Sequence, residues 1–135
     1  MITAVDTNVL LDIFTEDATF VRASSGALRE CMASGALIGC EVVWAELGGA
    51  FESTDRAAAA LARLGVRFVP MDAPAALEAG HMWRQYRRRG GTRRRMIADF
   101  LIGAHAQLHA DRLLTRDRGF YATYFADLRV FDPSC

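Results

Sequence analysis

Four acidic residues of this chain lie among apolar or small neighbours, unlike ordinary surface acids. They are Asp6, Glu46, Asp99 and Asp117. If they converge, two carboxylates about 4 Å apart repel by about 4 kcal/mol at an effective dielectric near 20. Oxygen ligands without His or Cys suit Mg²⁺ or Mn²⁺ better than zinc, so we predict a site for one of these ions. Such an ion can activate a water molecule and neutralise charge that develops on a phosphate during in-line displacement.

Two of the acids follow predicted strands. Asp6 comes after Ile2–Val5, and Asp117 comes after Arg112–Thr115. Ligands of open parallel sheets bind where the strands end and the loops begin, so we expect both carboxylates at the same edge. The alternative for each residue alone is a helix cap or a turn.

The other two acids fall in predicted helices. The neighbours of Glu46 three and four positions away are apolar or small, which predicts a buried charge that costs several kcal/mol unless it is paired. A salt bridge to a distant arginine is the alternative. Asp99 lies in the first turn of a buried helix, where the helix dipole alone favours an anion. The small residues Gly103 and Ala106 beside it predict space for a ligand.

The elements that must position these acids alternate between short apolar strands and helices. This alternation predicts one α/β domain over residues 1–135, a three-layer α/β/α sandwich with a short, mostly parallel central sheet. The predicted strands are 2–5, 37–40, 66–69, 112–115 and 129–131. The predicted helices are 9–14, 19–34, 42–53, 56–64, 73–89, 96–109 and 120–125, with Thr54 or Asp55 as the cap of the fourth.

Composition narrows the function classes. All 16 basic residues are Arg and balance 16 acids, so positive charge acts locally, above all in the seven arginines between Arg84 and Arg95. The absence of Lys excludes a P-loop or Schiff-base enzyme. Three widely spaced cysteines predict reduced thiols, with Cys31 and Cys40 buried. No signal-peptide pattern and no run near 18 apolar residues is present, so we expect a cytoplasmic protein with no membrane contact.

The four acidic motifs, in their order and spacing, resemble those of the PIN-domain ribonucleases, and the short form is similar to the VapC toxins of bacterial toxin–antitoxin pairs. The resemblance covers Ile2 to about Phe131. The motifs are Val5-Asp6-Thr7-Asn8-Val9-Leu10, Ala45-Glu46-Leu47, Asp99-Phe100-Leu101-Ile102-Gly103-Ala104-His105-Ala106 and Leu114-Thr115-Arg116-Asp117.

The resemblance implies an endoribonuclease that binds Mg²⁺ or Mn²⁺ through Asp6, Glu46, Asp99 and Asp117 and is inhibited by a small antitoxin protein. It also implies that Asn8 and Thr115 brace the acids. Many family members carry a further acid two residues after the fourth, but here that position is Gly119, so a second ion would be held less well.

Arginines near the acids are candidates for contact with RNA phosphates. We predict this role for Arg93, Arg94, Arg95 and Arg116. A solvated helix end, or a dock for an acidic antitoxin tail, is the alternative for the cluster. His105 and His109 have a metal-ligand spacing, but without a third ligand we interpret them as core or boundary residues. Phe51 and residues 57–61 offer an apolar surface for a homodimer, and ordinary core packing explains them equally well.

Two rival functions remain from the sequence. A haloacid-dehalogenase-like phosphatase also places an Asp after a strand, but it requires a second Asp where Asn8 stands and normally a Lys. A PIN-like module that binds RNA or protein without cleaving is the non-enzymatic rival; the intact acids argue against it, and Gly119 leaves it open.

Overall fold

The computed structural model describes residues 1–91 and 97–134. Within these residues a five-stranded sheet forms the centre, with the strand order β3-β2-β1-β4-β5 and parallel pairing throughout. The strands are β1 (Ile2–Val5), β2 (Ala36–Gly39), β3 (Val66–Phe68), β4 (Arg112–Leu114) and β5 (Val130–Phe131). The helices are α1 (Thr7–Phe14), α2 (Val21–Ser34), α3 (Glu41–Ala50), α4 (Thr54–Arg63), α5 (Ala73–Arg88), α6 (Ile97–His109) and α7 (Arg118–Tyr124).

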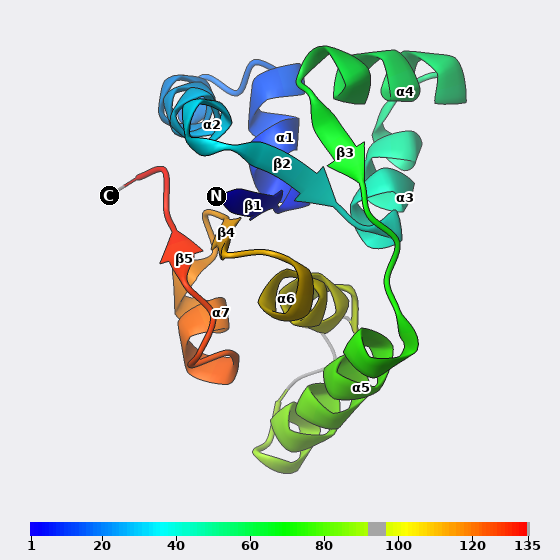
Figure 1. Ribbon diagram of the computed structural model, residues 1–135, viewed down its shortest axis with the longest axis vertical. Coiled ribbons are helices and arrows are strands. Elements are labelled where there is room, and N and C mark those ends of the chain that lie inside the picture. The colour runs from blue at the N-terminus through cyan, green and yellow to red at the C-terminus, as the bar shows by residue number, and fades with distance from the viewer. Residues whose placement is uncertain (92–96, 135) are drawn as a thin grey trace.

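Helices lie on both faces of the sheet. Figure 1 shows α1 and α2 on one face and α6 on the other, with α5 packed outside α6. Helix α3 contacts both α1 and α6 beside the sheet. The predicted α/β/α sandwich with a parallel sheet is therefore confirmed.

Helix starts follow from local capping. Asp72 accepts a hydrogen bond from the Ala75 amide at 3.0 Å at the start of α5, where Pro74 occupies the first turn. At α4 the cap is Ser53, which accepts from the Arg56 amide at 3.2 Å. The prediction of Thr54 or Asp55 as this cap was wrong, because the helix already begins at Thr54.

Aromatic rings of α5, α6 and α7 pack together in one continuous layer. Phe100 of α6 is its centre, with ring centroids 5.5 Å from Tyr86 of α5, 5.0 Å from Phe120 and 5.7 Å from Tyr124. Edge-to-face rings at such separations add about 0.5 to 1.5 kcal/mol per pair to their burial. This aromatic layer, completed by Phe125, fixes the end of α5 against the start of α6 and against α7.

Two further predictions concern the cysteines and contact with a membrane. Cys31 and Cys40 are free and buried, as predicted. No described helix has the length and apolar content that crossing a bilayer requires.

Candidate active site

Asp6 lies where the central strand β1 ends and α1 begins. Its side chain is buried, with 5% of the residue exposed. The Asp6 amide donates to the Leu114 carbonyl at 2.9 Å, which places the residue beside the end of β4. The two strand ends predicted to meet at one edge therefore do so.

Three side chains donate hydrogen bonds to the same carboxylate oxygen of Asp6, Oδ2. Thr115 Oγ1 donates to Oδ2 at 2.7 Å, the Tyr121 hydroxyl at 3.3 Å and Asn8 Nδ2 at 3.4 Å. Hydrogen bonds to a carboxylate favour its charged form and fix its orientation. These three bonds therefore fix the orientation of the Asp6 carboxylate through Oδ2.

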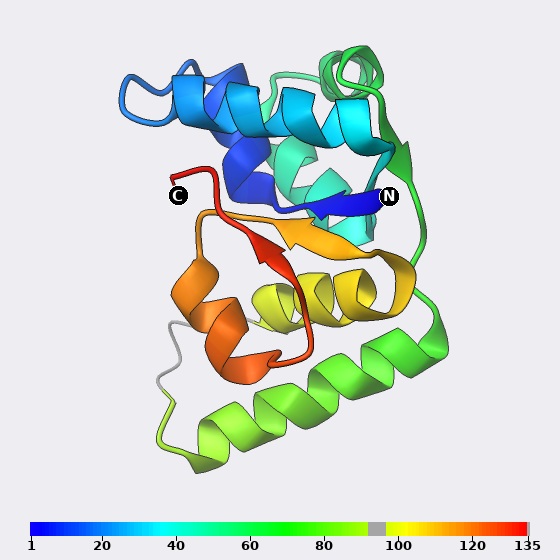
Figure 2. The ribbon, with the colours of Figure 1, turned by 60° about the vertical axis from the view of Figure 1, so that its left-hand side comes forward.

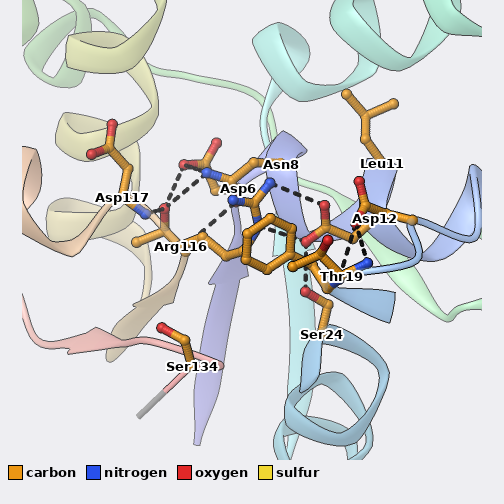
Figure 3. Close-up of polar contacts among 12 residues, drawn as sticks. Asp6, Asn8, Leu11, Asp12, Thr19, Ser24, Arg116, Asp117 and Ser134 are labelled. Carbon is orange, nitrogen blue, oxygen red and sulfur yellow. Dashed lines mark hydrogen bonds and ion pairs between the residues drawn. The ribbon is translucent and has the colours of Figure 1, made fainter. Parts of the chain in front are cut away.

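The same network holds the loop that follows β4. The Asp117 amide donates to Thr115 Oγ1 at 3.0 Å, and the Arg116 amide donates to Asn8 Oδ1 at 3.3 Å. Asn8 and Thr115 thus make the contacts with Asp6 that their predicted bracing role requires. The role itself stays a prediction. Figure 3 shows Asp6 and Asn8 between Asp117 on one side and Asp12 on the other.

Electrostatics disfavour charge on Asp6 in the protein alone. The pKa of Asp6 is raised from 3.8 to about 6, chiefly by burial and also by the nearby charge of Asp99, although hydrogen bonds from Thr115, the Thr7 backbone and Tyr121 oppose the shift. Burial and the charges of Asp6, Asp99 and Asp117 also raise the pKa of the Tyr121 hydroxyl, so it remains a donor. A divalent cation would relieve both the repulsion and the desolvation, so these oxygens fit a hard ion.

The described side chains do not form a closed metal cage. Among residues 1–91 and 97–134, no three His, Cys, Asp or Glu side chains stand close enough together to hold a metal ion. Mg²⁺ usually keeps several waters and binds through one or two carboxylates plus phosphate oxygens, which is compatible with this open arrangement. The predicted four-acid ligand set therefore stays a proposal.

Glu46 lies on the surface, so its predicted burial was wrong. The residue is exposed on α3, and Oε1 accepts a hydrogen bond from Thr7 Oγ1 at 2.8 Å. Its small neighbours face solvent instead of enclosing it, because Ala45, Gly49 and Ala50 are also exposed. Through this bond Glu46 nevertheless contacts Thr7, the residue that follows Asp6 in the chain.

Asp99 and Asp117 are both partly exposed, Asp99 in the first turn of α6 and Asp117 at the start of α7. The space predicted beside Asp99 is already filled. A Cβ added at Gly103 would lie 2.5 Å from the Phe125 ring, so Gly103 is small because it packs against an aromatic side chain. The middle of the helix is buried as predicted, at Phe100 and from Ile102 to Ala106, whereas Ile97 and Leu108 are 38% and 50% exposed.

Arg116 makes contacts within the fold, and its predicted contact with RNA stays a prediction. Its Nε and Nη2 donate to the two Asp12 oxygens at 2.6 and 3.0 Å, and its guanidinium lies 3.8 Å from the Phe20 ring centroid (Figure 3). Ser24 Oγ also donates to Asp12, at 2.7 Å. Arg116 therefore links α1, α2 and the loop after β4. Arg93, Arg94 and Arg95 lie outside the described residues.

The remaining sequence candidates lie in the core or at its boundary. His105 is buried, and its Nε2 lies 2.8 Å from the Val69 carbonyl oxygen, as expected of a core histidine. His109 lies 3.0 Å from Asp72 at the protein boundary. Ala57, Ala60 and Leu61 are buried, in agreement with ordinary core packing of this face, and the homodimer stays a prediction.

The sequence did not indicate Tyr121 or Asp12 as parts of this site. Tyr121 looks like one of several aromatic residues of a short helix, and only the fold shows that its hydroxyl reaches Asp6. Asp12 follows Leu10 and Leu11 inside a helix, as Glu46 follows Trp44 and Ala45 in another. That pattern of an acid among apolar residues was a usable signal for Asp12.

Comparison with known proteins supports the architecture. A structure titled VapBC-1 from nontypeable Haemophilus influenzae matches over 100% of both chains, with 19% identity and a TM-score of 0.76. VapBC2 from Rickettsia felis bound to a promoter DNA fragment matches over 98% of both, with 16% identity and a TM-score of 0.75. FitAB bound to a DNA fragment shares 27% identity over 98% of this chain and 95% of its own, with a TM-score of 0.69. A search of curated proteins finds no match.

The family model described as PIN domain matches residues 3–126. The matched range contains all four acids, the network around Asp6 and every strand except β5 and the first residue of β1. This match argues against the dehalogenase-like alternative. The chain belongs to the PIN-domain family.

Proposed function

We propose that the chain is a Mg²⁺- or Mn²⁺-dependent endoribonuclease of VapC type, a single-domain toxin that hydrolyses RNA phosphodiester bonds in the cytoplasm. One observation carries the proposal: a buried carboxylate at the end of the central strand, oriented through Oδ2 by three donors and repelled by Asp99. Such an environment is unfavourable until a cation arrives, which is typical of a functional site.

In this proposal Asp6, Asp99, Asp117 and Glu46 hold the ion. When bound, the ion supplies the positive charge that stabilises the phosphate as it is attacked. Thr115, Tyr121 and Asn8 hold Asp6 in one orientation, so Oδ1 is presented without reorganisation. Thr7 positions Glu46 from the next residue of the chain.

The test is RNA cleavage by the purified chain with Mn²⁺ or Mg²⁺, with and without EDTA. We expect cleavage that requires the ion, and a loss of about a thousandfold or more in Asp6→Asn and in Asp99→Asn. Asp55→Asn, which removes an exposed acid from α4, is the matched control and should remain within about twofold of the wild type. Equal hydrolysis by an Asp6→Asn/Asp99→Asn double variant contradicts the proposal.

We also propose a small antitoxin protein as the partner. The support is the similarity to structures named VapBC and FitAB and to one titled a toxin–antitoxin complex from Klebsiella pneumoniae, at 22% identity. A small protein encoded beside this chain should form a stable complex with it and suppress cleavage. Full activity of such a complex contradicts this part.

A non-cleaving PIN-like module that binds RNA or protein is the second candidate. It is favoured by the lack of three clustered ligands among the described residues and by Gly119 at the position of a further acid. The two candidates differ in one result, because a binding module shows no activity that appears with Mn²⁺ and disappears with EDTA.

A further inference from the structure

The last turns of α5 carry a positively charged hollow that the proposed chemistry does not use. Arg84, Arg87 and Arg88 line a surface depression of about 480 Å³. Their spacing of three and four residues places them on one face of the helix. All three are exposed. The hollow is therefore open to a ligand from solvent.

The charge in this hollow is not neutralised within the described part of the chain. Neither Arg84 nor Arg88 has a described acidic partner, and Arg87 contacts only the Trp83 ring, at 5.0 Å. By contrast, Arg56 pairs with Glu52 and Arg116 with Asp12. Guanidinium groups bind phosphate through parallel hydrogen bonds, and three of them on one face favour an anionic ligand.

The hollow is also fixed in position relative to the acids. Tyr86, between Arg84 and Arg87 in sequence, packs on Phe100, the residue after Asp99. It also contacts Tyr124 of α7 at 5.4 Å, so the end of α5 is attached to both helices that carry acids at their starts. Figure 2 shows the end of α5 on the side of the molecule toward which β1 and β4 run.

We infer that this hollow binds backbone phosphates of single-stranded RNA at nucleotides beside the one that is cleaved. The inference rests on the proposed function. The end of α5 packs on α6 and α7, so under this inference a strand that extends from the acids to α5 meets positive charge for its phosphates in the hollow. Arginine planes also accept stacked bases without selecting sequence, as in other single-strand grooves. The α5 hollow thus contributes affinity and sets a preference for longer RNA.

Binding is measured in the Asp6→Asn background, by fluorescence anisotropy with a labelled 16-nucleotide RNA of mixed sequence, across a range of salt concentrations. The test variant is Arg84→Ala/Arg87→Ala/Arg88→Ala. The matched control is Arg22→Ala/Arg29→Ala/Arg63→Ala, which removes the same charge from exposed positions on α2 and α4. Urea unfolding of both triple variants establishes that each is folded.

We expect the test variant to bind about tenfold or more weakly at moderate salt, and the control to stay within about twofold. The slope of log affinity against log salt should fall by about 2 in the test variant, since each lost single-strand phosphate contact contributes about 0.7. Equal losses in the two triple variants, or no loss in the test variant, overturn the inference. So does a test variant that binds RNA normally but loses binding of an acidic peptide, because the partner is then a protein.

Cleavage separates this inference from the proposed function. With Asp6 intact, the test variant should lose more kcat/KM on the 16-nucleotide RNA than on a tetranucleotide, because only the longer strand spans both regions. Equal losses at the two lengths contradict the inference. If the wild type cleaves neither RNA, the proposed function fails, and the anisotropy measurement still decides whether the hollow binds RNA.

Discussion

The strand ends around Asp6 and the last turns of α5 carry opposite charges. They differ in how many partners within the described residues the charged side chains have. At the strand ends, Thr115, Tyr121 and Asn8 hold one oxygen of Asp6. In the α5 hollow the arginines have no described acidic partner. Ordered groups suit chemistry that needs fixed geometry, whereas free guanidinium groups suit a flexible polymer whose phosphates arrive in varied positions.

Arg116 shows why residue type alone does not assign a role. It lies in sequence between Thr115 and Asp117, closer to the acids than any arginine of α5. Yet its guanidinium is bonded to Asp12 and stacked on Phe20. We interpret it as a positioning residue that keeps the loop after β4 in place.

The largest expected effect on stability comes from Arg116→Ala. It leaves the buried Asp12 carboxylate with Ser24 as its remaining described side-chain partner, so the free energy of unfolding should fall by about 2 to 4 kcal/mol. The α5 triple variant removes three exposed arginines and should change it by about 1 kcal/mol or less. Urea unfolding measures both.

The double variant Asp12→Asn/Arg116→Ala provides the control for this pair. It removes the uncompensated charge, so it should be more stable than Arg116→Ala alone. If Arg116→Ala is as stable as the wild type, the ion pair is not structural, and the contrast with α5 disappears.

The next effect concerns Asp6 and depends on pH. The pKa of Asp6 is raised from 3.8 to about 6, so the folded protein binds this proton more tightly than the unfolded chain does. Its stabilising contribution is complete below pH 3.8 and is lost as the pH rises through 6. In EDTA, Asp6→Asn should therefore be more stable than the wild type by about 2 to 3 kcal/mol at high pH.

Urea unfolding of wild type and Asp6→Asn over a pH series measures this difference. It should shrink toward zero as the pH falls to about 4, while contributions of the other ionisable groups cancel between the two proteins. Added Mn²⁺ should stabilise the wild type more than Asp6→Asn. A difference that does not change with pH shows that Asp6 is not unfavourably charged in the folded protein.

The smallest expected effect is that of Tyr121→Phe. The substitution keeps the buried ring but removes the donor to Asp6 at 3.3 Å, a loss of about 0.5 to 1.5 kcal/mol. Because this bond lowers the pKa of Asp6, the acid limb of the cleavage profile should move to higher pH. Tyr124→Phe is the matched control, and an equal shift there contradicts a specific role for Tyr121.

Much of the fold follows from sequence because its signals are local. Short apolar strands, Gly65 after α4 and Pro74 at the start of α5 placed most elements within one to three residues of their positions. Asp6 and Asp117 could be assigned to one edge because parallel strands all end on the same side. Helix α1 begins earlier than predicted, at Thr7, since Asp6 already caps it through its backbone.

What could not be predicted depends on contacts between residues distant in sequence. The apolar and small neighbours of Glu46 in sequence predict burial. Only the packing of α3 shows that this face of the helix is exposed to solvent. Gly103 suggested a vacant site because nothing local indicates that Phe125 occupies it. The bond from Tyr121 to Asp6 spans 115 positions, beyond the reach of any spacing rule.

The strand order has a consequence for how this site can change over time. From β1 the chain crosses toward β2 on one flank, and from β4 it crosses toward β5 on the other. The two connections diverge, so a crevice opens above the adjoining strand ends whatever side chains line it. Substitutions there can alter which ligand is accepted without disturbing the backbone pairing, so the site can change while the scaffold stays constant.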